Sequence, residues 1–237
     1  MAVIRLQSVS KKFTRRQDGS RSLRAFVWQG LKGKKSEDFW ALRNIDLTVE
    51  RGERLAILGR NGSGKTTLIR LVAQTLVPTL GKVLVEGTVA PLVSFTTGFD
   101  VRLSGYDNAF LRASLFGLSR KEIEELLPRV VEFAELEKAI HFPVETYSAG
   151  MTARLGFSLS VHMQADIYLM DEGLSTGDSL FQKKAQQAMS DRIRNDGTWV
   201  IVTHDLDMAR EFCGRGIVLH DGEIVAQGPV SELSGAF

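Results

Sequence analysis

The most constraining feature of this 237-residue sequence is a glycine-rich segment between a strand pattern and a helix pattern. GRNGSGKT, residues 59–66, follows the apolar run RLAILG and precedes TTLIRLVAQTL, whose apolar residues recur at helical spacing. The segment matches the pattern G-x-x-x-x-G-K-[ST], whose backbone N–H groups converge on phosphate oxygens. The strand before it and the helix after it are the context that this pattern requires. An ordinary glycine-rich turn is the alternative, but it would not require both flanking elements. The sequence therefore predicts a phosphate-binding loop.

The side chains of this loop indicate a nucleotide with a divalent cation. Lys65 is expected to meet the β and γ phosphates, and the Thr66 hydroxyl can ligate Mg²⁺. The predicted nucleotide contacts are Gly59, Arg60, Asn61, Gly62, Ser63, Gly64, Lys65, Thr66 and Thr67.

A second segment, IYLMDE at 167–172, ends a hydrophobic strand pattern in two carboxylates. Such a strand would place Asp171 beside the phosphate loop as a ligand of the Mg²⁺ shell. Glu172, one step further, could orient or deprotonate an attacking water. The alternative is that two acidic residues simply end a strand. Beside a phosphate loop, the pair predicts ATP hydrolysis rather than binding alone.

His204 follows the buried strand pattern WVIVT, at the edge where parallel α/β sheets hold their ligands. We therefore expect it to contact the γ phosphate. The other three histidines, His141, His162 and His220, are assigned structural roles by default.

A further Ser-x-Gly turn, Ser148 to Gly150, leads into an apolar helix pattern over 151–163. Its N–H groups and the helix dipole would form a second anion site. A plain helix cap is the alternative. One chain would then have one nucleotide loop but two phosphate-binding surfaces, which suggests a head-to-tail dimer that closes over ATP.

The remaining patterns outline the fold. Strand patterns at 54–59, 166–170 and 198–204 alternate with helix patterns and predict a parallel sheet, whereas residues 101–164 read as almost entirely helical. SRKE at 119–122 is a capping box that begins one of these helices. Alternating residues at 3–9 and 45–50 predict half-buried strands, and IVLHDGEIVAQ near the end predicts a hairpin.

The charge of the chain is unevenly distributed. Residues 11–35 hold nine Lys and Arg against one acidic residue, which leaves 21 basic and 27 acidic residues elsewhere. Within this stretch Leu23, Phe26, Val27 and Leu31 fall at the spacing of a short amphipathic helix. The segment could bind lipid headgroups, could bind nucleic acid, or could be a solvated loop. Nucleic acid is not expected, because stacking aromatics interleaved on a sheet are missing.

The sequence has no apolar run long enough to span a bilayer and no signal peptide, and its one cysteine, Cys213, excludes an intrachain disulfide. We therefore expect a cytoplasmic protein, and any work at a membrane would be done through a partner. The sequence ends at Phe237, just past the predicted hairpin, so no further module is expected after it.

In order and spacing, the phosphate loop, YSAGM, IYLMDE, STGD and TWVIVTH resemble the ATP-binding cassette subunit of ABC transporters over essentially the whole chain. The resemblance implies an α/β fold with a RecA-like mixed-sheet core, an antiparallel β subdomain and a helical lobe. The implied single domain has its core at about 1–95 and 165–237, its lobe at about 96–164 and a basic insertion at about 14–39.

YSAGM stands where the family usually has LSGGQ, with Ala149 in place of a glycine. The resemblance implies that Ser148, Ala149, Gly150 and Asp178 contact the nucleotide of the opposite subunit. It makes Glu172 the catalytic base and His204 the switch histidine, and implies that Phe13 stacks on adenine. Asp100 stands where the family commonly has a glutamine and is the third candidate metal ligand, after Thr66 and Asp171.

LSGYDN in place of LTGREN, together with YSAGM and FWALRNIDL, narrows the resemblance to ATPases of bacterial polysaccharide exporters, of the O-antigen, capsule and teichoic acid types. It implies two ATPase chains and two copies of a polytopic membrane subunit, which docks at about 102–116, on the cytoplasmic face of the inner membrane. Residues 14–39 would contact the membrane or a lipid-linked glycan. Another cargo, a soluble ABC-type ATPase without a transport role and a P-loop kinase are the alternatives.

Overall fold

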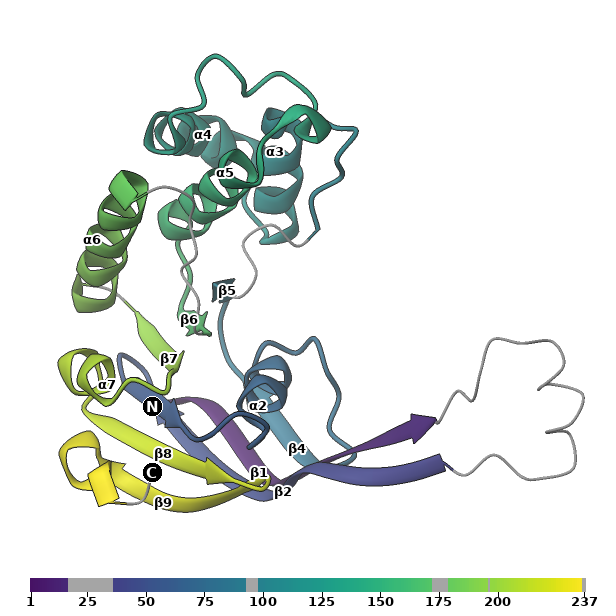
Figure 1. Cartoon of the computed structure of the whole chain (residues 1–237), viewed down its shortest axis with the longest axis vertical. Coiled ribbons are helices and arrows are strands. Elements are labelled where there is room, and N and C mark those ends of the chain that lie inside the picture. Colours follow the sequence, from purple (N-terminus) through teal and green to yellow (C-terminus); the bar gives the residue numbers. More distant parts are fainter. Residues whose placement is uncertain (17–35, 93–97, 172–178, 196, 236–237) are drawn as a thin grey trace, which may run out of the picture.

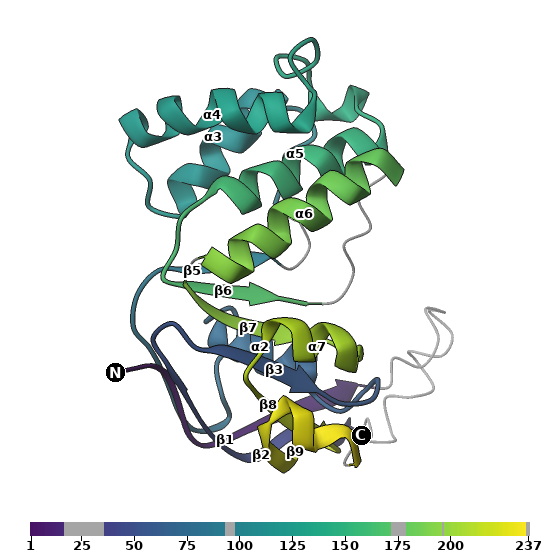
Figure 2. The same ribbon diagram turned by 90° about the vertical axis from the view of Figure 1, so that its left-hand side faces the viewer.

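The computed structural model describes residues 1–16, 36–92, 98–171, 179–195 and 197–235. These residues form two β-sheets and several layers of helices (Figure 1). The sheets occupy one end of the molecule and α3, α4 and α5 the other, with α6 between α5 and the strands β6 and β7 (Figure 2).

The larger sheet has the strand order β5-β6-β7-β3-β8-β9 and is parallel except for the final antiparallel pair. Its strands are β3 (Arg54–Leu58), β5 (Val89–Leu92), β6 (Ile167–Met170), β7 (Thr198–Val202), β8 (Arg215–His220) and β9 (Glu223–Pro229). All residues of β6 and β7 are buried, as expected for parallel strands that are covered on both faces. Pro91 is accommodated because β5 lies at the edge of the sheet, where a missing N–H donor leaves no neighbour unpaired.

Alternate residues of the central strands face two different layers. Ile57 and Leu169 pack in one apolar cluster with α2 (Lys65–Val72) and the smaller sheet. Leu58 and Met170 pack in a second cluster with α6 (Ser179–Asn195), α7 (Leu206–Phe212) and the 3-10 helix η2 (Val230–Gly235). The core sheet is therefore a filled layer between two sets of elements.

The smaller sheet is antiparallel, in the order β2-β1-β4, and consists of β1 (Ala2–Arg16), β2 (Ser36–Glu50) and β4 (Leu80–Val85). Its first two strands are much longer than the alternation at 3–9 and 45–50 predicts. They pair as far as Arg16 and Ser36, so both ends of the expected insertion at 14–39 belong to a regular ribbon. Aromatic and charged cross-strand pairs, such as Phe13 with Phe39, extend it. The helix predicted over 23–31 lies outside the described residues.

The helical layer contains α3 (Gly105–Leu115), α4 (Arg120–Ala134), the 3-10 turn η1 (Val144–Thr146) and α5 (Ala149–His162). The capping box predicted at 119–122 is confirmed, because the Ser119 and Glu122 side chains each accept a hydrogen bond from the other residue's backbone N–H. This layer has its own apolar cluster, to which Leu155 and Leu159 of α5 contribute. Phe157 and Val161 of the same helix belong to the second cluster, between the core sheet and α6. Helix α5 is thus shared between the two cores.

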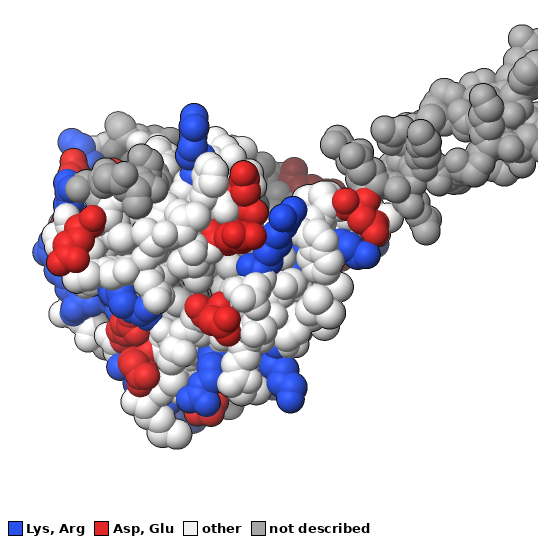
Figure 3. Space-filling model, turned by 90° about the horizontal axis from the view of Figure 1, so that it is seen from below, with Lys and Arg blue, Asp and Glu red and all other residues white. Residues whose placement is uncertain are grey.

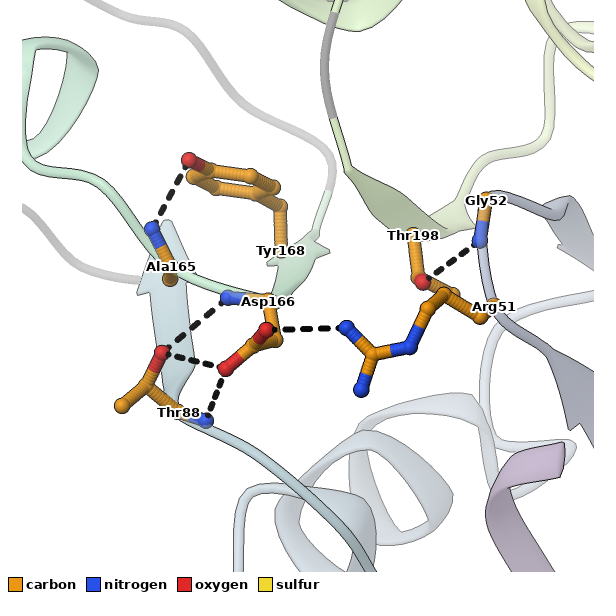
Figure 4. A network of polar contacts seen from close by, with 7 residues as sticks. All are labelled: Arg51, Gly52, Thr88, Ala165, Asp166, Tyr168 and Thr198. Carbon is orange, nitrogen blue, oxygen red and sulfur yellow. Dashed lines mark hydrogen bonds and ion pairs between the residues drawn. The ribbon is translucent and has the colours of Figure 1, made fainter. Parts of the chain in front are cut away.

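A polar network at the far edge of the core joins segments distant in sequence (Figure 4). The Asp166 carboxylate accepts hydrogen bonds from the backbone N–H and hydroxyl of Thr88 and forms an ion pair of 3.1 Å with Arg51. These contacts lower the pKa of Asp166, the Thr88 backbone bond contributing most. Gly52 N donates to Thr198 Oγ1 at 3.0 Å beside it. The network fixes the turn between β2 and β3 against the start of β6.

Candidate active site

The predicted phosphate loop connects the end of β3 with the start of α2. The Lys65 ammonium turns back over the loop and donates to the carbonyls of Gly59, at 2.5 Å, and Arg60, at 3.1 Å. Its side chain is buried, and Ser63 Oγ is also buried without a hydrogen-bond partner among the described residues. The loop therefore encloses one cation and one unsatisfied hydroxyl, a composition suited to an anion.

The turn between β8 and β9 holds this loop in place. Gly222 N donates to Ser63 O at 3.0 Å, and Arg43 N of β2 donates to Gly222 O at 2.8 Å. Asp221 and Gly222 both have positive φ, as the hairpin pattern predicts. Three segments distant in sequence thus meet at the loop.

A cavity of about 870 Å³ opens over the phosphate loop. Asp171, at the end of β6, lines it together with loop and helix residues Asn61, Gly62, Gly64, Lys65, Thr66 and Thr67. The remaining lining residues are Phe13, Phe39, Trp40, Ala41, Arg43, His220, Asp221, Gly222, Glu223 and Val225. The sequence predictions for Phe13, Lys65, Thr66 and Asp171 therefore meet in one cavity.

Three of the lining side chains, Phe13, Phe39 and Trp40, are aromatic. The Phe13 and Phe39 rings stack with centroids 5.7 Å apart, and the Lys11 ammonium lies 5.2 Å from the Phe13 centroid. Trp40, next to Phe39, has the Lys12 ammonium 5.8 Å from its ring. Flat apolar faces flanked by cations suit a base attached to a phosphate chain.

The cavity also offers the space that a nucleotide requires and the oxygen ligands that a magnesium ion requires. A Cβ built on Gly62 would meet nothing within 4 Å, so there is open space above the loop for a phosphate chain. The Thr66 hydroxyl and the Asp171 carboxylate line the same space and supply the oxygen ligands that Mg²⁺ prefers. The residues present therefore fit Mg-ATP.

Asp100 does not line this cavity. Its carboxylate forms a two-pronged ion pair with Arg102, at 3.0 and 2.8 Å, and this guanidinium holds the pKa of Asp100 at about 2. Asn108, which is buried, accepts from Asp100 N and donates to Asp100 O. In this structure, Asp100 orders the loop before α3.

Three other residues with predicted roles in catalysis or nucleotide contact are not among the lining residues of the cavity. His204 follows β7 and is exposed, but it is not among the residues that line the cavity. Glu172 and Asp178 lie outside the described residues.

Ser148 is the N-cap of α5, and its Oγ accepts a hydrogen bond from Met151 N at 3.2 Å. Ser148 and Ala149 are exposed, and Gly150 is half-buried. None of the three lines the cavity over the phosphate loop. The second predicted anion site therefore faces outward, on an exposed helix N-terminus.

Comparisons with known proteins agree with this arrangement. The model of the family described as ABC transporter matches residues 42–175, more than half of the chain. The chain belongs to the ABC transporter family. A teichoic acids export ATP-binding protein of Lactococcus lactis is 39% identical over 231 residues, covering 97% of this chain and 49% of its own length. An O-antigen export system ATP-binding protein of Klebsiella pneumoniae is 38% identical over 207 residues, covering 87% and 83% respectively.

Solved structures show the same fold. A dimeric ATP-binding cassette in a post-hydrolysis state with ADP and Pi matches with a TM-score of 0.70 and 22% identity, covering 96% of this chain and 98% of that chain. An ATP-binding subunit of an ABC transporter matches with a TM-score of 0.74 and 20% identity, covering 99% and 93%. The predicted fold class, an α/β ABC cassette with a mixed sheet, an antiparallel sheet and a helical lobe, is confirmed.

The chain spans about half the length of the Lactococcus lactis relative. Within the described residues, no helix combines the length and the apolar character needed to cross a bilayer.

The sequence reading missed part of the cavity wall. His220, expected to be structural, lines the cavity, as do Phe39, Trp40 and Glu223. Phe39 and Trp40 carried a usable signal, since they are two adjacent aromatics shortly before the alternation at 45–50, and both lie in β2, where Phe39 pairs with Phe13. No local pattern signals His220, because its position depends on how the final hairpin docks onto the phosphate loop.

Proposed function

We propose that this chain is the ATPase subunit of an exporter, and that it binds and hydrolyses Mg-ATP as a head-to-tail homodimer. The cavity over Lys65 would hold the nucleotide, with Phe13 and Phe39 against the base. Thr66 and Asp171 would hold Mg²⁺, which neutralises phosphate charge when bound.

The observation that carries this proposal is the separation of the two predicted phosphate-binding surfaces. The α5 N-terminus presents Ser148 to solvent, away from the cavity of its own chain. A helix N-terminus with an exposed first turn attracts anions. A second copy related by a twofold axis would bring each α5 N-terminus to the nucleotide of the other chain.

In the closed dimer, Glu172 would activate the attacking water and His204 would contact the γ phosphate, with Asp178 near the opposite subunit. Glu172→Gln preserves size and hydrogen bonding but cannot accept the proton. We expect this variant to lose turnover, to retain ATP binding and to accumulate as a nucleotide-bound dimer in size-exclusion chromatography with ATP. Hydrolysis at the wild-type rate would remove Glu172 from this role.

The names of the relatives support a polysaccharide, of the teichoic acid or O-antigen kind, as the exported cargo. A separate polytopic membrane subunit, in two copies, would carry it, with the ATPase on the cytoplasmic face of the membrane. The predicted docking segment at 102–116 supports this, since it exposes Leu111 and Leu115 on one face of α3. Copurification with the membrane subunit, and its loss on Leu115→Glu, would test the docking.

The basic segment at 14–39 is proposed to contact the membrane surface or a lipid-linked glycan. On the face seen in Figure 3, the described acidic and basic side chains are interspersed. In the sequence, an excess of positive charge lies between β1 and β2. Binding of the chain to anionic vesicles, lost when residues 17–35 are deleted, would support this role.

A further inference from the structure

Helix α5, whose N-cap is Ser148, is held to α6 by a compact set of contacts in which Glu135 is central. Glu135 follows the last residue of α4 and adopts a left-handed conformation, φ 58°. Its Oε2 lies 2.9 Å from Arg154 Nη1 of α5, and its Oε1 lies 3.3 Å from Lys184 Nζ of α6. One carboxylate therefore bridges cations from two helices.

Aromatic rings lie beneath both cations. The Arg154 guanidinium stands 5.0 Å from the ring of Phe181, and the Lys184 ammonium stands 4.5 Å from the ring of Phe133. Phe157 packs against both rings, with centroid distances of 6.2 and 6.1 Å. Phe157 and Phe181 are fully buried, and the Arg154 side chain is only 20% exposed. The Arg154 cation over its ring is therefore held more firmly than an ordinary surface pair, whereas the Lys184 and Glu135 side chains are 39% and 55% exposed.

The position of these contacts connects the two halves of the proposed reaction. Arg154 lies six positions after Ser148, less than two helical turns along α5. Helix α6 begins soon after Asp171, which lines the nucleotide cavity. Both helices also contribute residues to the second apolar cluster, which contains Leu58 and Met170 of the core sheet. The angle between α5 and α6 thus sets where Ser148 lies relative to the core that holds the nucleotide.

We propose that Glu135 is a positioning residue, which fixes the N-terminus of α5 relative to α6 by pairing with Arg154 and Lys184. It lies outside the nucleotide cavity. Its effect is to hold the Ser148 turn at the angle that the partner's nucleotide requires. This inference rests on the proposed head-to-tail function, which it extends to a specific residue.

Glu135→Gln tests the proposal, because it removes the charge while keeping the shape of the side chain. The matched control is Glu137→Gln, an exposed glutamate two positions further along the same connection. Spin labels on Glu145→Cys and Lys183→Cys would report the distance between the start of α5 and α6 without ATP. The native Cys213 would react little, because it is buried and burial raises its pKa to about 12.

We expect Glu135→Gln, but not Glu137→Gln, to broaden the distance distribution. We also expect it to lower the kcat of ATP hydrolysis by at least about fivefold, the change that a loss of about 1 kcal/mol of transition-state stabilisation produces. KM for ATP should stay unchanged, and Glu135→Asp should recover part of the lost kcat. The melting temperature should fall by no more than about 4 °C, since a partly exposed pair contributes little to stability.

An unchanged distance distribution would overturn the proposal, and so would a broadened one with wild-type kcat. A parallel substitution separates this outcome from failure of the proposed function. If Gly150→Asp leaves turnover at the wild-type level, the head-to-tail function fails. The distance distribution alone then decides whether Glu135 fixes α5.

Discussion

Two glycines of the phosphate loop offer a matched pair of substitutions with different expected results. A Cβ on Gly59, at φ 149°, would lie 2.4 Å from the carbonyl oxygen of Leu219 and 2.7 Å from Ser63 Oγ. A Cβ on Gly62, at φ 84°, would meet nothing within 4 Å, although it would enter the nucleotide cavity. Gly59→Ala should therefore disturb the fold, whereas Gly62→Ala should mainly disturb the ligand.

The magnitudes follow from these contacts. For Gly59→Ala, overpacking against backbone of about 1–3 kcal/mol adds to backbone strain of about 1–2 kcal/mol, or about 2–5 kcal/mol in total. At roughly 2–4 °C per kcal/mol for a chain of this size, its melting temperature should fall by about 10 °C at the centre of that range. Gly62→Ala carries only the strain of about 1–2 kcal/mol and should melt about 2–8 °C below wild type. Its ATP affinity should fall at least about tenfold, since a methyl group displaces phosphate contacts worth about 1.4 kcal/mol or more.

Thermal unfolding followed by circular dichroism, and calorimetric titration with ATP, would measure both effects. If Gly59→Ala and Gly62→Ala had the same melting temperature, the inference that Gly59 packs tightly against Leu219 of β8 would be refuted. If Gly62→Ala bound ATP with wild-type affinity, the phosphate chain would not lie over this part of the loop.

Two further predictions concern single side chains. Phe13→Ala should weaken ATP binding by roughly tenfold or more, as expected for loss of base stacking of about 1–3 kcal/mol, while binding of inorganic tripolyphosphate stays unchanged; equal losses for both ligands would refute base stacking. Asp100, whose pKa is about 2 because of Arg102, should titrate near pH 2 by NMR and return toward its ordinary pKa in Arg102→Ala. Since its folded pKa is depressed, its stabilising contribution is present above about pH 4 and is lost as the pH falls toward 2; a midpoint near 4 in the wild type would contradict the ion pair.

Much of the fold could be predicted because its signals are local. The strands at 54–58, 167–170 and 198–202 are short apolar runs, and each ends close to a chemically distinctive residue. The Ser119 capping box and the Asp221–Gly222 turn depend only on neighbouring residues, and the structure contains both. Local side-chain chemistry was sufficient for these elements.

Other features could not be predicted because they depend on contacts between distant segments. The β1–β2 ribbon continues through charged residues that interrupt the expected alternation. Lys12 of β1, for example, forms an ion pair with Asp38 of β2. Strand β5 contains a proline and is recognisable as a strand only beside β6. The wall formed by His220 and Glu223 exists because the final hairpin docks against Ser63. In each case the determining interaction joins residues far apart in sequence.

A mixing experiment tests most directly whether each reaction centre is shared between two copies of the chain. Lys65→Ala removes the phosphate-binding cation from the cavity. Gly150→Asp places a carboxylate in the first turn of α5, where the helix dipole tolerates it but a bound phosphate does not. Each variant alone should be inactive, and each should remain folded.

In a one-to-one mixture, about half of the dimers combine both variants, and each of these has one intact centre, so about a quarter of wild-type hydrolysis should return. With both substitutions on one chain, mixing with wild type leaves no intact centre in the mixed dimer. Recovery of phosphate release in the first mixture, above the sum of the two variants alone, is the predicted result. No recovery, although native mass spectrometry detects the mixed dimer, would contradict the shared reaction centre.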